Sequence, residues 1–456
     1  MNRPVFTDES DVASSDAGIA RTLRLRLLPF LFVGFVIAFL DRVNVGFAAL
    51  TMNPDLRITS REFGFAAGVF FLGYVLFEIP SNLLLHRFGA RTWIARILIT
   101  WGGVATLTGF VESAQGLYLA RFVLGLAEAG FVPGVILYLG YWFCERDRAF
   151  ANALFMTAIP VASILGGPAS GLILDRVHWW GLSSWRWLLI LEGMPAVFAG
   201  LVAYLLLPNG PKDASFLSPD ERERLVGVLE REDQDRNRSR SAIAGLTEGR
   251  LWFLAAIGFA HGFGGYTFTF FLPQTLAGLW RGSSNSLVGL LIVIPNLLGL
   301  SGMVLVSRSS DRTLERRGHL AIPVALAGLA LLSLSLTRSP WLSTALLGVV
   351  AFGVYSFLPV FFALPGERLA GPAAASGIAL VTSVANLGGF AGPIVAGVLR
   401  ERAGSLYPGL GCAGASLLLA GLLAAVRPSS GEPDPGDRLR GLRESAVASK
   451  PLPSLE

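Results

Sequence analysis

Apolar segments long enough to cross a lipid bilayer recur throughout this chain of 456 residues. A hydrocarbon core about 30 Å thick is crossed by roughly 20 residues of helix, and a helix satisfies its own backbone polar groups in lipid. The pattern therefore predicts an all-α polytopic membrane protein. Its twelve expected transmembrane helices lie at 27–49, 62–85, 92–111, 116–139, 149–174, 185–207, 251–276, 286–306, 319–337, 341–363, 373–398 and 406–426.

The composition agrees with a membrane protein and excludes several other classes. Apolar residues make up 53% of the chain and charged residues only 15%, against about 25% charged in soluble domains. No basic cluster with interleaved aromatic residues predicts nucleic-acid binding. The four histidines are scattered and the two cysteines, Cys144 and Cys412, lie far apart, so we expect free thiols, no metal site and no cofactor.

The positions of lysine and arginine predict the orientation. With the N-terminus inside, about 26 of the 37 lie on the cytoplasmic side and about 8 outside, as expected for cytoplasmic termini. Residues 1–26 are then a cytoplasmic tail. Residues 427–456 are rich in proline, serine and charge, which predicts a disordered cytoplasmic tail.

The longest internal loop, 208–250, contains the sequence LSPDERERLVGVLERED. Ser218 and Glu221 form a capping-box pattern, with Pro219 at the first helical position. Leu225 and the apolar residues that follow it form a narrow stripe. This pattern predicts a short amphipathic helix in a cytoplasmic linker, lying against the bundle or the lipid headgroups.

Several landmarks repeat at an offset of 225 residues. Gly64 near the start of the second span and Gly289 near the start of the eighth are each followed, 23 residues later, by an arginine, and Gly167-Pro168 aligns with Gly392-Pro393. The repeat predicts two pseudo-symmetric six-helix halves, 27–207 and 251–426. In secondary transporters with such repeats, the substrate site lies between the halves near the midplane.

Four charged residues fall within the predicted spans. The apolar run before Asp41 and Arg42 is only 14 residues, about 21 Å of helix, so the first span must include this pair. Arg121 and Glu128 lie two turns apart on one face of the fourth span. Intramembrane charges are costly and usually mark a pathway or site.

The residue types indicate a chemistry. Arginine presents a permanently charged fork that suits a carboxylate, and a carboxyl group in a low-dielectric interior can bind and release a proton near neutral pH. Two arginines and two acids around one cavity fit proton-coupled movement of an organic anion. The alternative is that the acids neutralise the arginines and fix helix packing, with Asp41 and Arg121 as structural counter-ions.

Other polar residues in the spans are weaker candidates. Tyr74 and Asn386 are candidates for substrate contact, with packing as the alternative for Tyr74. His261 is a further candidate for a titrating group, although a packing histidine is the simpler interpretation. Glu78 and Glu192 lie close to prolines, and we interpret them as structural.

Four stretches of the sequence resemble the major facilitator superfamily: LDRVNVGFAALTMNPDL, GYVLFEIPSNLLLHRFGARTWIARI, RFVLGLAEAGFVPGVILYLGYWF and SGIALVTSVANLGGFAGP. Within it they are similar to the anion:cation symporters, close to bacterial permeases for tartrate, phthalate, 4-hydroxyphenylacetate and sugar acids. The resemblance covers about residues 25–427. It implies a multi-pass transporter of the bacterial inner membrane that alternates access by rocking two halves and carries a carboxylate with protons.

The resemblance also implies roles for individual residues. Arg42 would bind the substrate carboxylate, Asp41 and Glu128 would couple protons, and Arg121 would pair with these acids or line the path. The tyrosine of the second span and the asparagine of the eleventh match Tyr74 and Asn386. In the loop between spans 2 and 3, Asn82 and His86 replace the usual Gly and Asp; the second-half copy keeps Asp311 and Arg312 but has Ser307 in place of the Gly.

Taken together, the sequence predicts a monomeric importer of a small organic acid by proton symport, in a lipid bilayer and without enzymatic activity. An organic-anion exchanger or a drug-efflux pump on the same fold is the alternative within transport. A membrane enzyme would need a catalytic loop or metal site, which the short external loops lack. A transport-inactive sensor on this fold stays open from sequence alone.

Overall fold

The computed structural model describes residues 9–236, 249–364 and 371–426, and these form α-helices joined by short loops and 3₁₀ turns. The first half contains α1 (Glu9–Asp55), α2 (Ser60–Phe88), α3 (Ala90–Thr108), α4 (Ala114–Glu128), α5 (Phe131–Gly140), α6 (Glu145–Met156), α7 (Ala158–Arg176) and α8 (Ser184–Leu206). After the linker helix α9 (Pro219–Arg236), the second half contains α11 (Gly249–Leu279), α12 (Asn285–Thr313), α13 (Arg317–Ser333), α14 (Pro340–Ala363), α15 (Gly371–Ala403) and α16 (Tyr407–Ala425).

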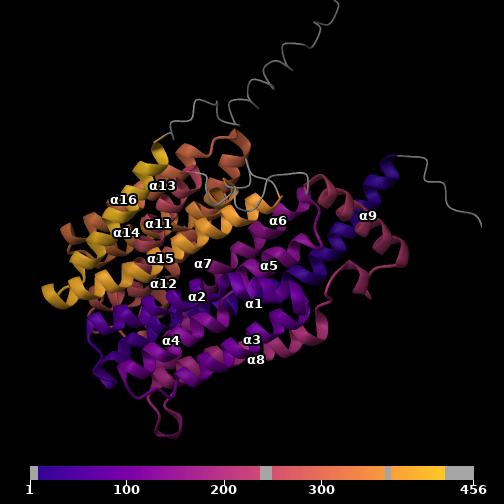
Figure 1. The fold of residues 1–456 in the computed structure, drawn as a ribbon. Helices are drawn as coiled ribbons and strands as arrows, with labels where there is room; N and C mark the ends of the chain where they lie inside the picture. Colours follow the sequence, from indigo (N-terminus) through magenta and orange to yellow (C-terminus); the bar gives the residue numbers. More distant parts are fainter. Residues whose placement is uncertain (1–8, 237–248, 365–370, 427–456) are drawn as a thin grey trace, which may run out of the picture.

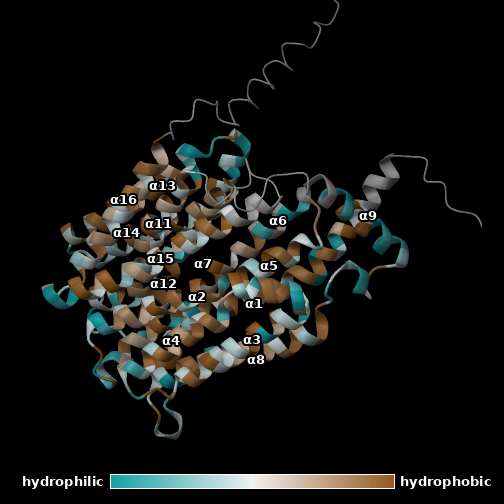
Figure 2. Cartoon of the chain, in the orientation of Figure 1, coloured by the Kyte–Doolittle hydropathy of each residue, from teal (hydrophilic) through white to brown (hydrophobic). Residues whose placement is uncertain are grey.

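The helices agree with the predicted spans. Within the described residues, ten stretches are long and apolar enough to cross a membrane by length and composition. The helices α3 and α11 occupy the places of the other two predicted spans, and they pack against α8 and α15. Hydrophobic residues cover the lengths of the helices, and hydrophilic residues gather at their ends and on α9 (Figure 2).

The two halves lie side by side, with the indigo and magenta helices on one side and the orange and yellow helices on the other (Figure 1). They meet along three helix pairs: α2 with α15, α7 with α12, and α1 with α11. Because α2 and α12, and likewise α15 and α7, are related by the predicted repeat, the first two pairs are pseudo-symmetric copies of one another.

We call the end of the bundle near α9 the linker end and the other end the distal end. Arg24 of α1 pairs with Asp147 of α6 at 2.5 Å, and Arg148 of α6 pairs with Glu232 of α9 at 3.4 Å, which places these elements together at the linker end. The alternating helices then bring the loops α1–α2, α7–α8, α11–α12 and α15–α16 to the distal end.

Two features of the termini and linker compare with the sequence predictions. The α1 helix begins at Glu9, inside the predicted tail 1–26, and Leu23 and Leu27 are buried, so the tail continues the first helix. The predicted linker helix and its capping box are confirmed, since the Ser218 amide donates to Glu221 at 2.8 Å and the Glu221 amide to the Ser218 hydroxyl at 3.3 Å. The predicted tail 427–456 lies outside the described residues, and the division into halves stays a prediction.

Candidate functional site

Asp41 and Arg42 of α1 are buried and point toward different helices, as their adjacent positions on a helix predict. The Asp41 carboxyl accepts a hydrogen bond from Trp101 of α3 at 2.7 Å. The Arg42 guanidinium instead meets Glu128 of α4 and the rings of Phe70 and Tyr74 on α2. The two charges therefore belong to separate groups of side chains.

Arg42 and Glu128 form an ion pair through Nη2 and Oε1. Their side chains are 8% and 0% exposed, so little solvent screens the pair. The guanidinium centre lies 5.3 Å from both the Phe70 and the Tyr74 ring centroids. Among the described residues, Nε of Arg42 and Oε2 of Glu128 are buried without a hydrogen-bond partner. The pair is thus deeply buried but incompletely satisfied.

The fourth span is broken at Glu128, which corrects the prediction of one continuous helix over 116–139. α4 ends at Glu128, and α5 begins at Phe131. Between them Ala129 is extended and Gly130 adopts φ 85°, a left-handed conformation that glycine accepts most easily. A Cβ at Gly130 would also lie 2.3 Å from the Ser81 hydroxyl. The break puts Glu128 at a helix end inside the bundle, a geometry found at transporter binding sites.

Arg121, seven residues before Glu128, contacts backbone rather than a carboxylate. Its Nε donates to the Ala66 carbonyl at 3.4 Å, and its Nη2 donates to the Arg42 carbonyl at 3.5 Å. Its guanidinium lies 4.9 Å from the Phe70 ring centroid, on which Arg42 also lies. Arg121 therefore ties α4 to α1 and α2 next to Arg42.

The other predicted site residues divide between the two halves. Tyr74 is buried against Arg42, as described above. Asn386 of α15 is 8% exposed and lies one turn before Gly389, where Tyr266 and Phe71 approach. His261 of α11 has different partners: its Nε2 is 3.0 Å from the Val354 carbonyl, and its ring stacks on Phe357 at 3.8 Å. This placement fits the packing interpretation of His261.

The second half contributes polar groups that the sequence analysis did not select. The Tyr266 ring of α11 packs 4.3 Å from Phe71 of α2, and its hydroxyl is close enough to interact with the Arg42 charge. Asn296 of α12 accepts a hydrogen bond from the Tyr355 hydroxyl at 3.0 Å. These residues lack a charge or a motif that would distinguish them in sequence, although Tyr266 follows the GFGG run that contains no other polar side chain.

Glycines bring the two halves into backbone contact toward the distal end. A Cβ built on Gly289 of α12 would lie 2.2 Å from the Gly167 carbonyl oxygen of α7, and one on Gly171 would lie 2.3 Å from that of Asn285. In the pseudo-symmetric pair, a Cβ on Gly64 of α2 would lie 2.3 Å from the Pro393 carbonyl oxygen of α15. These distances leave no room for side chains, so the halves are closed against each other here.

Two carboxylates strengthen this closure by capping helices of the opposite half. Asp175, at the end of α7, accepts hydrogen bonds from the α12 amides of Asn285 at 3.1 Å and Ser286 at 2.7 Å. Glu401, at the end of α15, accepts one from the Arg61 amide of α2 at 3.0 Å. Each acid thus satisfies orphan amides at a helix N-terminus across the interface.

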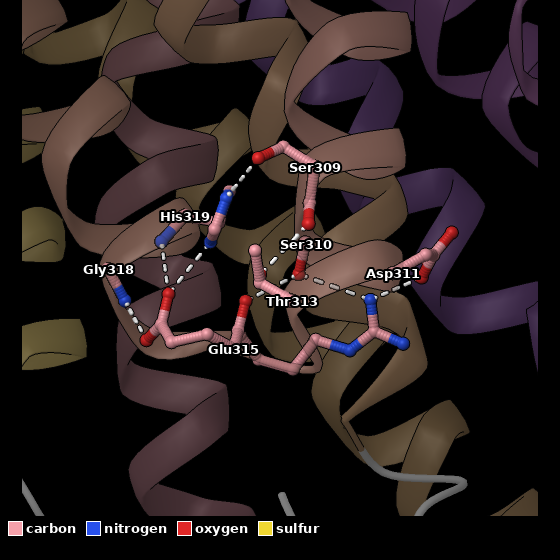
Figure 3. A network of polar contacts seen from close by, with 8 residues as sticks. Ser309, Ser310, Asp311, Thr313, Glu315, Gly318 and His319 are labelled. Carbon is pink, nitrogen blue, oxygen red and sulfur yellow. Dashed lines mark hydrogen bonds and ion pairs between the residues drawn. The ribbon is translucent and has the colours of Figure 1, made fainter.

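At the linker end, the loop between α12 and α13 is organised by hydrogen bonds within the second half (Figure 3). Arg316 pairs with Asp311 at 2.5 Å, so Asp311 is held within its own loop. Glu315 caps α13 by accepting the Gly318 amide at 2.6 Å and also meets the His319 ring at 2.7 Å. In the first-half copy of this loop, His86 lies 3.2 Å from the Tyr141 hydroxyl.

The Glu315 cap predicts a modest effect on stability. Partial burial opposes ionisation, but the Gly318 amide and His319 hold the pKa of Glu315 below its usual 4.5. A lowered native pKa stabilises the fold at neutral pH, and this contribution is lost as the pH falls through that value. We expect Glu315→Gln to reduce the unfolding free energy by about 1 kcal/mol, as for loss of a cap. Thermal unfolding in detergent at pH 7 and at acidic pH measures this; an equal loss at both would contradict the assignment to the carboxylate.

The chain matches the family described as Major Facilitator Superfamily over residues 31–364. It is 41% identical over 421 residues to a protein named putative tartrate transporter from Agrobacterium vitis, covering 92% of this chain and 93% of that relative. It is 38% identical over 394 residues to a protein named quinolone resistance transporter from Acinetobacter baumannii, covering 86% and 91%.

Among solved structures, the fold resembles a bacterial homologue of the human lysosomal transporter Spinster in an inward-facing and unoccupied conformation. The TM-score is 0.68 at 16% identity, covering 88% of this chain and 94% of that one, which bears on the fold alone. The family match and the helical bundle confirm the predicted superfamily and fold class, and they exclude the membrane enzyme considered from sequence. The chain belongs to the major facilitator superfamily and is a multi-pass secondary transporter.

Proposed function

We propose that this transporter imports a small organic carboxylate together with protons. The observation that carries the proposal is the buried Arg42–Glu128 pair, which lies where the halves meet and retains an unpartnered donor and an unpartnered acceptor among the described atoms. A buried arginine is the residue best suited to hold a carboxylate in a fixed geometry. The relative named for tartrate, a dicarboxylate, supports the same substrate class.

Glu128 occupies the place on Arg42 that a substrate carboxylate would take. A proton on Glu128 weakens its hold on Arg42, and the substrate carboxylate then replaces it as the counter-ion. The charge of the site stays the same through the exchange, which avoids the high free energy of an unpaired buried charge. Substrate binding and proton binding are thereby linked at one arginine, with Asp41 as a second proton-coupling acid on the other face of α1.

The surrounding residues have supporting roles in this proposal. Tyr74 and Asn386 would contact the rest of the substrate from α2 and α15, and Tyr266 would complete this side from α11. Arg121 would position the α1 backbone at Arg42, to which it donates at 3.5 Å, while its charge keeps the path favourable for anions.

The arrangement also fits alternating access in a bacterial cytoplasmic membrane. Lysines and arginines favour the linker end as the cytoplasmic side, so the glycine contacts and carboxylate caps would close the periplasmic side. Substrate would enter when these contacts separate and leave toward the linker end when they form.

Efflux is the second candidate, because one relative is named a quinolone resistance transporter. Two buried arginines beside the proposed site favour anions over cationic or lipophilic drugs. Uptake of tartrate and of a fluoroquinolone into proteoliposomes, with each pH gradient direction, distinguishes the two. Accumulation of a fluoroquinolone, with no movement of carboxylates, would favour efflux over the proposal.

Glu128→Gln tests the coupling step. The amide mimics a protonated glutamate, so we expect substrate exchange to persist while accumulation driven by a pH gradient is lost. Each coupled proton contributes a factor of about ten in accumulation per pH unit. The measurement is radiolabelled tartrate uptake and counterflow in proteoliposomes, with a panel of hydroxy, dicarboxylic and aromatic acids as alternative substrates.

Gln at Glu230, an exposed glutamate of the linker helix, is the matched control and should leave both activities unchanged. Undiminished gradient-driven uptake by the Glu128→Gln protein would rule out this role for Glu128.

A further inference from the structure

A second group of buried acids lies on the Asp41 face of α1. Glu192 of α8 is 7% exposed, and its carboxyl is close enough to Asp41 for their charges to interact. Throughout the described ranges, no lysine or arginine forms an ion pair with either acid. Two buried carboxyls without a cation cannot both ionise cheaply, because their charges repel each other in a medium of low dielectric constant. One of the pair is therefore suited to hold a proton.

Hydrogen bonding identifies which acid this is. Both oxygens of Asp41 accept hydrogen bonds, one from Trp101 at 2.7 Å and one from the Asn44 amide nitrogen at 3.3 Å. Glu192 accepts from the Ser170 hydroxyl at 2.7 Å through Oε1 only. Asp41 is thus satisfied as a carboxylate, whereas Glu192 is not.

Two buried acceptor atoms are left over at this place. Within the described structure, Oε2 of Glu192 and Oδ1 of Asn44 have no hydrogen-bond donor, although the Asn44 side chain interacts with Glu192. Two acceptors cannot satisfy each other, and leaving buried polar atoms unpaired is costly. One proton on Oε2 would supply the missing donor and satisfy both atoms.

We propose that Glu192 is a proton-binding residue of the transport cycle and that Asn44 links it to Asp41. The protonated Glu192 donates to Oδ1 of Asn44, and the Asn44 amide donates to Asp41. No bond other than the O–H bond forms or breaks, and the proton comes from water and returns to water. The proton that the sequence analysis assigned to Asp41 is thereby carried beside it.

The charged groups around this site leave it distinct from the Arg42–Glu128 pair. The helices α1, α3 and α7 face Glu192 with Asp41, Trp101 and Ser170. The charges that reach Asp41 are those of Glu192, Glu128 and Arg121. Because no ion pair has to break, Glu192 takes up its proton without displacement by substrate.

The position of Ser170 connects the site to the interface between the halves. Ser170 lies between Gly167 and Gly171, the α7 residues in backbone contact with α12. A cavity of about 20 Å³ at this interface, lined by Asn44, Ser163 and Ser170 among others, has room for about one water. Separation of α7 from α12 would open this place to the distal side, so the movement that admits substrate also admits the proton.

The part of this inference that concerns transport rests on the proposed function, so the first test measures protonation alone. Infrared spectra of the full-length protein in lipid nanodiscs, recorded against pH, show the C=O stretching band of each protonated carboxyl. We expect a band near neutral pH that is absent in Glu192→Gln and present in Asp41→Asn and in the control Glu230→Gln. Loss of the band in Asp41→Asn but not in Glu192→Gln would overturn the assignment.

A second variant covers the case in which Glu192→Gln does not fold. Ser170→Ala removes the donor that favours the charged form of Glu192, so the same band should persist to higher pH. An unchanged titration in Ser170→Ala would contradict the proposal, because the hydroxyl bonds directly to this carboxyl.

The transport readout then tests the coupling. Glu192→Gln should keep counterflow but lower gradient-driven accumulation about tenfold per pH unit, the share of one proton. An unchanged accumulation ratio, together with loss of the infrared band, would refute the coupling role. Absence of carboxylate transport in the unmodified protein would refute the proposed function and leave the infrared result standing.

Discussion

Replacing Arg42 by alanine should abolish carboxylate uptake and exchange alike. The change removes the only charged side chain that is paired with Glu128 among the described residues, and with it the proposed anchor for substrate. Truncating one member of a buried charged pair at an interface costs about 2–5 kcal/mol, roughly thirtyfold to several thousandfold in affinity. Arg42→Lys keeps the charge but loses the planar fork, so we expect intermediate binding. Substrate affinity by isothermal titration calorimetry and counterflow in proteoliposomes measure both variants.

The alanine variant leaves Glu128 as an unpaired buried carboxylate, which by itself destabilises the fold. The double variant Arg42→Ala with Glu128→Gln removes both charges and separates folding from binding. It should unfold at a temperature close to that of the unmodified protein and bind no carboxylate. Saturable carboxylate binding by a folded double variant would show that the anchor lies elsewhere, with Arg121 as the first alternative.

The membrane fold could be predicted because span length and hydropathy are local properties of the sequence. The break in the fourth span could not, since it depends on Gly130 fitting a left-handed turn against Ser81 of another helix. The same holds for the caps at Asp175 and Glu401, which are ordinary helix-end acids until the fold brings the opposite half to them. Their relation is visible afterwards: Ser286 lies 225 residues after Arg61, and Glu401 lies 226 after Asp175.

The candidate site was predicted in the same uneven way. Arg42 and Glu128 are far apart in sequence, but both carry charge in an apolar span, and this alone was enough to group them. Glu192 was interpreted as structural because Pro195 follows it, and nothing in its neighbourhood indicates Asn44 or Asp41 on α1. Uncharged residues such as Asn44 acquire significance only when every buried donor and acceptor has been counted in three dimensions.

Adding one methyl group at Gly289 should shift the transporter toward the state that is open at the distal end. The Cβ of alanine would lie 2.2 Å from the Gly167 carbonyl oxygen, and backbone cannot retreat without separating α12 from α7. Overpacking of this kind costs about 1–3 kcal/mol, a shift of roughly five- to more than a hundredfold in the equilibrium between the states. Spin labels on cysteines at Trp180 and Arg281, in a protein lacking Cys144 and Cys412, should report a longer distance in the variant.

The control and the internal repeat make this prediction sharp. Alanine at Gly103 of α3, where a Cβ meets no atom within 4 Å, should leave the distance unchanged. Alanine at Gly64 should lengthen it as Gly289→Ala does, because its Cβ would lie 2.3 Å from the Pro393 carbonyl oxygen in the symmetry-related helix pair. An effect of one glycine without the other would mean that the two helix pairs do not open together. Equal effects would show that both separate in one movement, as the rocking of two rigid halves requires.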